Sequence, residues 1–354
     1  MDKRISILSK GLKQDIQLNT KIVEENKIYI NDHFIGKLNG LKIELNYSKS
    51  NLDTDIKSLK KAARSGAQEE LNKRIKYIIS NIETLELRDD YKVYWNNKKI
   101  AELKPGTNYL NPQIKLYTDD TVEEGQYIKL KLAIGNWIND QKKKYLKDLI
   151  SIEKAVFKNS FARGLAYQLF ENNGVLRREQ ANEIVKNLSK EERYILRQSG
   201  IKIGKYHIYQ PRMIRPEAIK FKSILWKCFF SSKDMVYPTF GLNFLSNFKN
   251  KNKDFLRICG FETFGQFIIR IDILERLFLE ILSNSKNYKF KLNSKILNLL
   301  GCNKNDFIKF IRYLGYQCME SAEDIEFKFI QKKYKKTIKK NKGNVFSILQ
   351  KLKV

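Results

Sequence analysis

Motifs for several common chemistries are absent from this sequence. It has no GxxxxGK(S/T) segment, which a phosphate-binding loop requires, and no serine or cysteine nucleophile motif. Only two histidines are present, His33 and His207, and the four cysteines form no CxxC pair that would suit zinc. Buried free thiols are the expected state of the cysteines, Cys228, Cys259, Cys302 and Cys318. The sequence predicts no catalytic residue, no cofactor site and no metal site.

Long hydrophobic runs are scarce as well. Residues 1–11 contain no apolar core of signal-peptide length. The most apolar stretch, residues 267–282, is interrupted by five charged side chains, Arg270, Asp272, Glu275, Arg276 and Glu280. We therefore expect a cytoplasmic protein with no membrane partner.

Acidic residues are outnumbered, with 39 aspartates and glutamates against 68 lysines and arginines. Several occur in pairs, such as Asp119-Asp120, in polar helix or turn contexts where solvated charge is the usual explanation. A nuclease that used Asp119 and Asp120 would need metal-dependent cleavage. We expect no such cleavage, because no carboxylate-rich motif follows a buried strand.

Positive charge is what the sequence has in excess. The formal net charge is +29, and the isoelectric point is about 9.7. Residues 327–354 contain ten lysines and no acidic residue. Lysines and arginines that neutralise phosphates release condensed counterions, so this composition favours a nucleic-acid partner over an anionic membrane surface. Compositional bias toward lysine is the alternative explanation.

A pattern of alternating apolar and polar residues occurs twice, 65 positions apart. Residues 28–45 read IYINDHFIGKLNGLKIEL, and residues 93–103 read VYWNNKKIAEL, with QIKLY at residues 113–117. Each copy contains a polar dipeptide that suits a tight hairpin turn, Asn31-Asp32 or Asn96-Asn97. The sequence therefore predicts two small antiparallel units.

A helical pattern follows each hairpin, over residues 53–84 and 122–157. In the second helix, the side chains expected to face inward are Ile128, Leu132, Trp137 and Leu146. A hairpin alone is marginally stable, so each copy must pack on its helix or on the other copy. The predicted fold class is α+β, beginning with a domain of duplicated β-hairpin and long helix over residues 1–158.

Three helices and a hairpin are predicted in residues 159–230. The helices are expected over residues 161–171, 177–187 and 189–198. Ser189 and Glu192 form a capping box at the start of the third, and residues 201–209, with Gly204 at the bend, suit a β-wing. This order is typical of a winged-helix module, which binds nucleic acid through one helix. A module that only supports a neighbouring domain is the alternative.

The candidate nucleic-acid contacts of this module are basic or aromatic. They are Arg177, Arg178, Arg193, Arg197, Lys202, Lys205, Tyr206, Tyr209 and Arg212. The basic side chains would neutralise phosphates, while the tyrosines and His207 could stack on bases. No acid or nucleophile lies at motif spacing beside His207, which favours a structural role for that residue.

A second, similar module is predicted over residues 255–326, after a linker at residues 231–254. Its expected elements are a helix over residues 267–283, a strand over 290–292, helices over 294–300 and 306–314, and a return strand over 316–319. The core of the last helix is expected to be Phe307, Ile308, Phe310 and Ile311. Its outward-facing candidates for binding nucleic acid are Lys304, Lys309 and Arg312, beside Tyr313.

Several segments resemble one known family when they are taken together and in order. They include FARGLAYQLFENNGVLRREQ, LRQSGIKIGKYHIYQP, LRICGFETFGQFIIRIDILERL and LLGCNKNDFIKFIRYLGYQ. These are similar to the C-terminal half of alphaproteobacterial superfamily-2 helicases, which are related to the RNA helicase of the mitochondrial degradosome. The hairpins and residues 2–12 also resemble that family's region after the motor, so the resemblance covers roughly residues 2–320.

The resemblance implies a non-catalytic accessory region of an ATP-dependent helicase. In that family the motor domains lie upstream and bind ATP and Mg²⁺, and no position of this sequence matches their motifs. We expect the chain to bind single-stranded nucleic acid, RNA in preference to DNA, and to guide it to a motor in cis or in trans. A ribonuclease is a further expected partner. The alternative is a protein-docking module that recruits a helicase or nuclease.

Two origins fit a match that begins after the motor: a piece of a longer helicase, which we favour, or a separately encoded subunit. The lysine-rich tail, residues 327–354, matches the family least, so its expected role rests on charge. Its candidate contacts are Lys332, Lys333, Lys335, Lys336, Lys339 and Lys340. Deleting the tail is expected to weaken nonspecific binding and to leave the fold intact.

Overall fold

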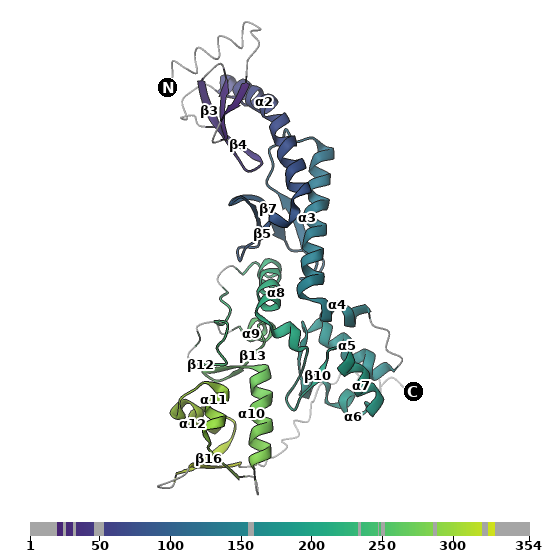
Figure 1. The fold of residues 1–354 in the computed structure, drawn as a ribbon, viewed down its shortest axis with the longest axis vertical. Helices are drawn as coiled ribbons and strands as arrows, with labels where there is room; N and C mark the ends of the chain where they lie inside the picture. The colour runs from purple at the N-terminus through teal and green to yellow at the C-terminus, as the bar shows by residue number, and fades with distance from the viewer. Residues whose placement is uncertain are drawn as a thin grey trace, which may run out of the picture.

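The computed structural model of the chain is elongated, with long helices at one end and two groups of short helices at the other (Figure 1). It describes residues 20–23, 26–30, 33–45, 53–154, 159–232, 235–246, 248, 252–285, 289–320 and 325–329. Within these residues the fold is α+β, with eleven α-helices and five small antiparallel sheets. The predicted fold class is confirmed at this level.

The N-terminal part contains two four-stranded meanders, each followed by a long helix. The first consists of β1 (Thr20–Val23), β2 (Lys27–Ile30), β3 (His33–Asn39), β4 (Lys42–Leu45) and α2 (Asp53–Ser80). A short 3-10 helix, η2 (Ile82–Thr84), leads to the second. The second consists of β5 (Glu86–Leu87), β6 (Lys92–Trp95), β7 (Lys98–Lys104), β8 (Gln113–Leu116) and α3 (Glu124–Tyr145).

Strand pairing in the second meander repeats that of the first. Ile28 of β2 pairs with Gly36, and 65 positions further on Val93 of β6 pairs with Ala101. The register of both pairs then shifts at the same place, directly after Ile28 and directly after Val93. Both predicted hairpins are therefore present, each as the centre of a four-stranded sheet with one pairing pattern.

Turn chemistry explains the hairpin of the second meander. Asn96 and Asn97 have φ angles of 45° and 59°, and positive φ at both central residues is what a type I′ turn requires. The corresponding Asn31-Asp32 turn lies outside the described residues. The two meanders also meet, because Leu41 forms a parallel bridge with Thr118 and accepts a 2.9 Å hydrogen bond from the backbone N–H of Asp119.

The buried face of α3 differs from the prediction at two positions. Leu130, Ile134, Trp137 and Ile138 are buried, which is one stripe of a helix with 3.6 residues per turn. The predicted inward residues Ile128 and Leu132 lie off that stripe, and their side chains are 48% and 62% exposed. Trp137 and Leu146 are buried as predicted.

A first three-helix module follows α4 (Lys147–Lys154). Its elements are α5 (Ser160–Glu171), β9 (Val175–Arg177), η3 (Arg178–Ala181), α6 (Asn182–Lys186), α7 (Lys190–Gln198), β10 (Lys202–Ile203) and β11 (His207–Tyr209). The helix predicted over residues 177–187 is shorter than expected, because Arg177 pairs with His207 in the sheet, whose order is β10-β11-β9. A 3-10 helix, η4 (Pro211–Ile214), and the largely buried α8 (Pro216–Phe229) complete this part.

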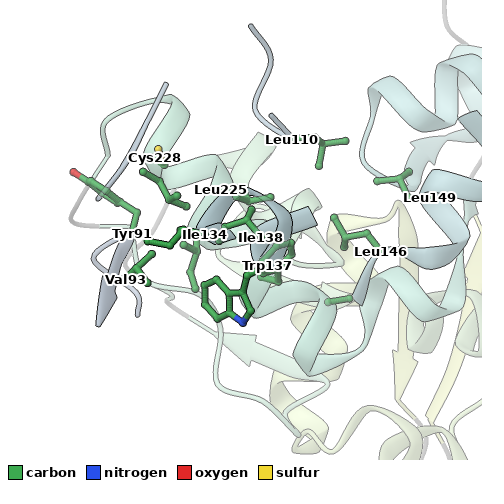
Figure 2. Close-up of a cluster of buried hydrophobic side chains, with 14 of the residues drawn as sticks. Tyr91, Val93, Leu110, Ile134, Trp137, Ile138, Leu146, Leu149, Leu225 and Cys228 are labelled. Atoms are coloured by element: carbon green, nitrogen blue, oxygen red, sulfur yellow. The ribbon is translucent and has the colours of Figure 1, made fainter. Parts of the chain in front are cut away.

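One hydrophobic cluster runs from the meanders through the first three-helix module to α8. Figure 2 shows Ile134, Trp137 and Ile138 of α3 gathered with Leu225 of α8. The hydrophobic core therefore continues across residue 158, where the sequence predicts a domain boundary.

The C-terminal part begins with a small sheet and ends with a second three-helix module. The sheet, of order β12-β14-β13, includes β12 (Phe244–Ser246), β13 (Phe261–Phe264) and β14 (Phe267–Arg270), with α9 (Lys253–Ile258) between its first two strands. The second module consists of α10 (Ile271–Asn284), β15 (Lys289–Lys291), α11 (Ser294–Leu300), α12 (Lys304–Tyr313), β16 (Tyr316–Glu320) and β17 (Ile325–Phe329). Its sheet order, β15-β17-β16, matches that of the first module, with the last strand in the centre.

One predicted boundary in this part is wrong. The helix predicted from residue 267 begins at Ile271, because Gly265, with φ of 60°, makes a turn that pairs Phe267 with Phe264 as a hairpin. The predicted linker at residues 231–254 contains β12, which pairs with β14.

The predicted tail also begins too early. Phe327 lies in β17, between β15 and β16, and its side chain is 0% exposed. Removing the chain from Phe327 onward would delete most of the central strand of this sheet, which contradicts the expectation that the fold would stay intact. The residues of the tail after Phe329 lie outside the described part.

Candidate nucleic-acid interface

A capped helix, α7, forms one wall of the candidate interface on the first three-helix module. The hydroxyl of Ser189 accepts a 3.2 Å hydrogen bond from the backbone N–H of Glu192, and the backbone N–H of Ser189 donates to the carboxylate of Glu192 at 2.7 Å. The predicted capping box is therefore confirmed, and it fixes where the helix begins. Leu196 faces the core, which leaves the polar side of α7 in solvent.

A basic groove lies between α7, the β10 strand, η4 and the N-terminal turn of α4, and its volume is about 940 Å³. Seven basic side chains line it: Arg178, Lys190, Arg193, Arg197, Lys202, Arg212 and Arg215. Asp148 is its one carboxylate. The structure thus gathers five of the predicted contacts, Arg178, Arg193, Arg197, Lys202 and Arg212, on one surface.

Three of these cations are held in place by the protein. Arg193 donates to the carbonyl oxygens of Leu188 and Val185, at 3.2 and 2.5 Å. Arg178 donates to the carbonyl oxygen of Gly204 at 2.7 Å. Arg212 forms a 3.1 Å ion pair with Asp148. Because carbonyl oxygens carry no net charge, Arg193 and Arg178 keep a full positive charge at the groove.

The other four cations have no carboxylate partner within the described residues. They are Lys190, Arg197, Lys202 and Arg215, and all four are exposed. Tyr194 of α7 also lines the groove, and its side chain is 63% exposed. A groove with clustered positive charge and an exposed aromatic ring suits a phosphate backbone with bases beside it.

Sequence reasoning missed three of the groove residues. Lys190 and Tyr194 were inside the predicted third helix. Each lies three residues before a predicted contact, Arg193 or Arg197, and therefore on the same outer face of the helix. Arg215 directly precedes Pro216 at the start of α8. The helical periodicity could have identified the first two, whereas Arg215 is brought to the groove by the path of η4.

The turn between β10 and β11 is fixed by a carboxylate from the second module. Glu275 of α10 accepts hydrogen bonds from the backbone N–H groups of Lys205, Tyr206 and His207, at 2.6, 2.9 and 2.7 Å. A Cβ atom at Gly204 would lie 2.4 Å from a Glu275 oxygen, so only glycine leaves room for this contact.

His207 lies between two buried carboxylates and links the modules. Its Nε2 is 3.0 Å from Glu262 of β13 and its Nδ1 is 3.3 Å from Glu275. Burial lowers the pKa of His207, but the hydrogen bonds to Glu262 and Glu275 outweigh burial and raise the pKa overall. Burial alone would raise the pKa of Glu262, yet hydrogen bonds from His207 and Arg177 lower that pKa to about 2.

This network reassigns three predicted contacts. Arg177 donates to Glu262 at 3.0 and 2.5 Å, so its guanidinium serves the link between modules. His207 is 2% exposed and Tyr209 is 1% exposed, so neither ring can stack on a bound base, in contrast to the prediction. Lys205 and Tyr206 remain exposed at the turn.

An inter-module cavity of about 630 Å³ lies beyond this turn. Arg177, Arg178, Lys205 and Tyr206 line it from the first module, and Glu262, Phe264 and Phe278 line it from the second part of the chain. The Tyr206 ring lies over that of Phe278, with centroids 3.9 Å apart. The cavity and the basic groove share Arg178.

The second module carries its own exposed basic side chains on α12. Lys304, Lys309 and Arg312 are exposed, and Tyr313 is 61% exposed. The core side chains predicted for this helix are all buried: Phe307, Ile308, Phe310 and Ile311. The predicted contacts at Lys332, Lys333, Lys335, Lys336, Lys339 and Lys340 lie outside the described residues.

The acidic pair and the cysteines noted in the sequence have the following surroundings in the described residues. Asp119 and Asp120 both pair with Arg64, at 2.9 and 3.2 Å, which gives this acidic pair a structural partner. Cys228 and Cys259 are buried free thiols as predicted, while Cys302 and Cys318 are half-buried. Among the residues with described positions, no cluster of histidine, cysteine and acidic side chains could hold a metal ion.

Two further findings concern the chain as a whole. None of the helices in the described ranges is both long and apolar enough to cross a membrane. No family model, curated protein or solved structure matches this chain.

Proposed function

We propose that this chain is a non-catalytic accessory region of an ATP-dependent helicase, which binds single-stranded RNA or DNA and guides it to a motor outside the chain. The basic groove carries the nucleic-acid part of the proposal, because seven cations face one carboxylate there. The helicase part rests on the family resemblance of the sequence. RNA is favoured over DNA on the same resemblance.

The topology supports this assignment. Both modules order their elements as helix, strand, two helices and a hairpin, which is the order of a winged helix. We interpret them as two winged-helix modules, and the two meanders with their long helices as a duplicated unit. In the first module the third helix, α7, and the β10 edge of the wing both border the groove.

Electrostatics predicts how binding responds to salt. For a single strand, the logarithm of the binding constant falls with the logarithm of salt concentration with a slope of about −0.7 per neutralised phosphate. Arg197 and Lys202 are exposed, have no carboxylate partner in the described part, and line the groove from two different elements, α7 and β10. Replacing both with alanine should therefore reduce the magnitude of this slope by about 1.4 and weaken binding.

Fluorescence anisotropy of a labelled single-stranded RNA, and of the matching DNA, titrated at several salt concentrations checks this expectation. The matched control replaces Lys129 and Lys131, which are exposed on α3 outside the groove, with alanine. The control should keep the wild-type slope. Binding that does not depend on salt, or no binding at low salt, would contradict the proposal and favour the protein-docking alternative.

The motor and a ribonuclease are the proposed protein partners. The isolated chain is expected to hydrolyse no ATP, because catalysis would reside in the motor. Capture of a helicase motor by the chain after nuclease treatment would support a direct contact. Capture that disappears after nuclease treatment would show that nucleic acid alone connects the two.

A further inference from the structure

The inter-module cavity and the basic groove both border the β10–β11 hairpin, and Arg178 lines both of them. Lys202 and Ile203 line the groove on one side of the turn, and Lys205 and Tyr206 line the cavity on the other. We propose that the cavity receives one unstacked base from a single strand whose phosphates lie in the groove. This inference rests on the proposed function and adds a subsite to it.

An aromatic surface in the cavity is suited to a base. The side chain of Tyr206 is 43% exposed, while Phe278 behind it is 5% exposed. Their ring planes meet at 37°, with centroids 3.9 Å apart, so Phe278 supports the tyrosine ring from within. Every base has a π-face, and stacking on an exposed ring is therefore tolerant of sequence.

A path of positive charge connects the groove to this ring. Arg178 lines both the groove and the cavity, and its guanidinium donates to the carbonyl oxygen of Gly204, where the turn begins. Lys202 lies in β10 before the turn and Lys205 lies in the turn itself, and both are exposed. A strand that crosses the turn would therefore keep its phosphates near a cation at each step.

The carboxylates of the cavity do not oppose this path. Glu262 already accepts hydrogen bonds from Arg177 and from the backbone N–H of Thr263, and it contacts His207. Glu179 is exposed and lies 3.7 Å from Arg177. Each carboxylate at the cavity thus has a cation beside it.

Hydrogen bonds within the protein hold the walls of the cavity together. Three backbone hydrogen bonds from the turn to Glu275 fix the first module against α10. A site that is already ordered loses less conformational entropy on binding than one assembled by its ligand. Its volume of about 630 Å³ also falls within the range of small-molecule sites.

The test uses the full chain and a single-stranded RNA of about 12 nucleotides, within the site sizes of single-strand binders, with one 2-aminopurine per oligonucleotide placed at each position in turn. Stacking on Tyr206 should quench 2-aminopurine at one position on binding. Tyr206→Leu should remove that quenching and weaken binding about tenfold, whereas Tyr206→Phe should retain both.

Two further variants separate this subsite from the groove. Asn182→Met places a longer side chain without an aromatic ring at the exposed cavity wall and should also remove the quenching, without removing the Tyr206 ring. Replacing Arg197 and Lys202 together should weaken binding of every oligonucleotide, so loss of binding there tests the groove alone. A blunt RNA duplex should show no quenching, because its bases are paired.

Three outcomes would overturn the inference. One is quenching that persists in both Tyr206→Leu and Asn182→Met while both variants bind the RNA. Another is equal quenching at every position of the wild-type complex. The third is tight, salt-dependent binding with no quenching at any position, which would leave the proposed function standing without this subsite.

Discussion

At the scale of single residues, His207 connects the protonation state of the protein to the contact between its modules. Both ring nitrogens face buried carboxylates, Glu262 and Glu275, while Arg177 neutralises Glu262 from the other side. With His207 protonated, two positive and two negative charges balance in this network. Deprotonation would leave one buried negative charge unpaired, which is costly.

Stability should therefore decline on the alkaline side. The pKa of His207 is raised in the folded state from its ordinary value of 6.5. A raised pKa means that the folded state holds the proton more tightly, so this contribution is complete below pH 6.5 and is lost as pH rises through the folded pKa. We expect the melting temperature to fall across this range, as measured by circular dichroism.

On the acid side, stability should increase as pH rises, because Glu262 has a lowered pKa in the folded state. The pKa of Glu262 is lowered from 4.5 to about 2, so its contribution is complete above pH 4.5 and is lost between pH 4.5 and 2. His207→Gln should flatten the alkaline decline while the acid decline remains. An unchanged alkaline decline in His207→Gln would mean that other groups cause it.

Local chemistry was predictable from the sequence where neighbours along the chain determine it. Ser189 and Glu192 form their capping box within one turn of helix, and Asn96 and Asn97 form their turn alone. The burial of Tyr209 depends on residues far away in the sequence, because Val175 and Ile271 pack around it in one buried cluster. The residues next to Tyr209 along the chain therefore do not show that its ring belongs to the core.

At the scale of elements, β17 shows how a charged neighbourhood can conceal a central strand. Glu326 and Lys328 flank Phe327, and the lysines that follow make this stretch resemble the start of a solvated tail. The alternation polar, apolar, polar is nevertheless that of a half-buried strand. Phe290 stacks on Phe327 with ring centroids 5.0 Å apart, and Phe307 meets it edge-on.

Removing this ring should destabilise the second module. Phe327→Ala is expected to lower the free energy of unfolding by about 3–5 kcal/mol, because it leaves a cavity in a fully buried site. Lys328→Ala, at the exposed position next to it, should change that free energy by less than about 0.5 kcal/mol. Urea unfolding of the two variants checks the difference.

Two truncated chains test whether β17, rather than the residues after it, stabilises the second module. A chain that ends at residue 329 keeps β17 and should retain the wild-type melting temperature of the second module. A chain that ends at residue 326 lacks Phe327, and its second module should melt at a lower temperature. Equal stability of the two truncated chains would show that β17 contributes little.

Element types were predictable where a pattern extended over a full helix or hairpin. The helix α11 was predicted at its observed residues, Ser294–Leu300, and the β10–β11 hairpin was placed around Gly204. Strands of two or three residues, such as β5 and β12, were missed because so few residues show no period. Their existence depends on partner strands rather than on their own sequence.

At the scale of the whole molecule, one carboxylate ties the two modules together. Glu275 belongs to the second module, yet its three backbone partners, Lys205, Tyr206 and His207, belong to the first. Burial would raise the pKa of Glu275, but hydrogen bonds from His207 and from these backbone groups lower it. This contact could not be predicted from the sequence, since its partners are about 70 positions apart and no motif joins them.

Glu275→Ala should uncouple the modules. It would leave the three N–H groups of the turn and Nδ1 of His207 without their carboxylate partner, at an expected cost of about 3–5 kcal/mol. Limited proteolysis should then cleave the turn near Lys205 faster, and small-angle scattering should report a broader shape. Glu280→Ala, on the same helix and paired with Lys295, is the control and should leave both measurements unchanged.

The bridge between Leu41 and Thr118 has a consequence for the order in which the two meanders fold. The first meander leaves the ribosome before Thr118 exists, so the Leu41 backbone has no partner at that stage. The contact forms only after β8 has been synthesised and the chain has turned toward α3. Closing a contact across so long a loop is slow, and the first meander therefore completes its fold only once the second one has followed it.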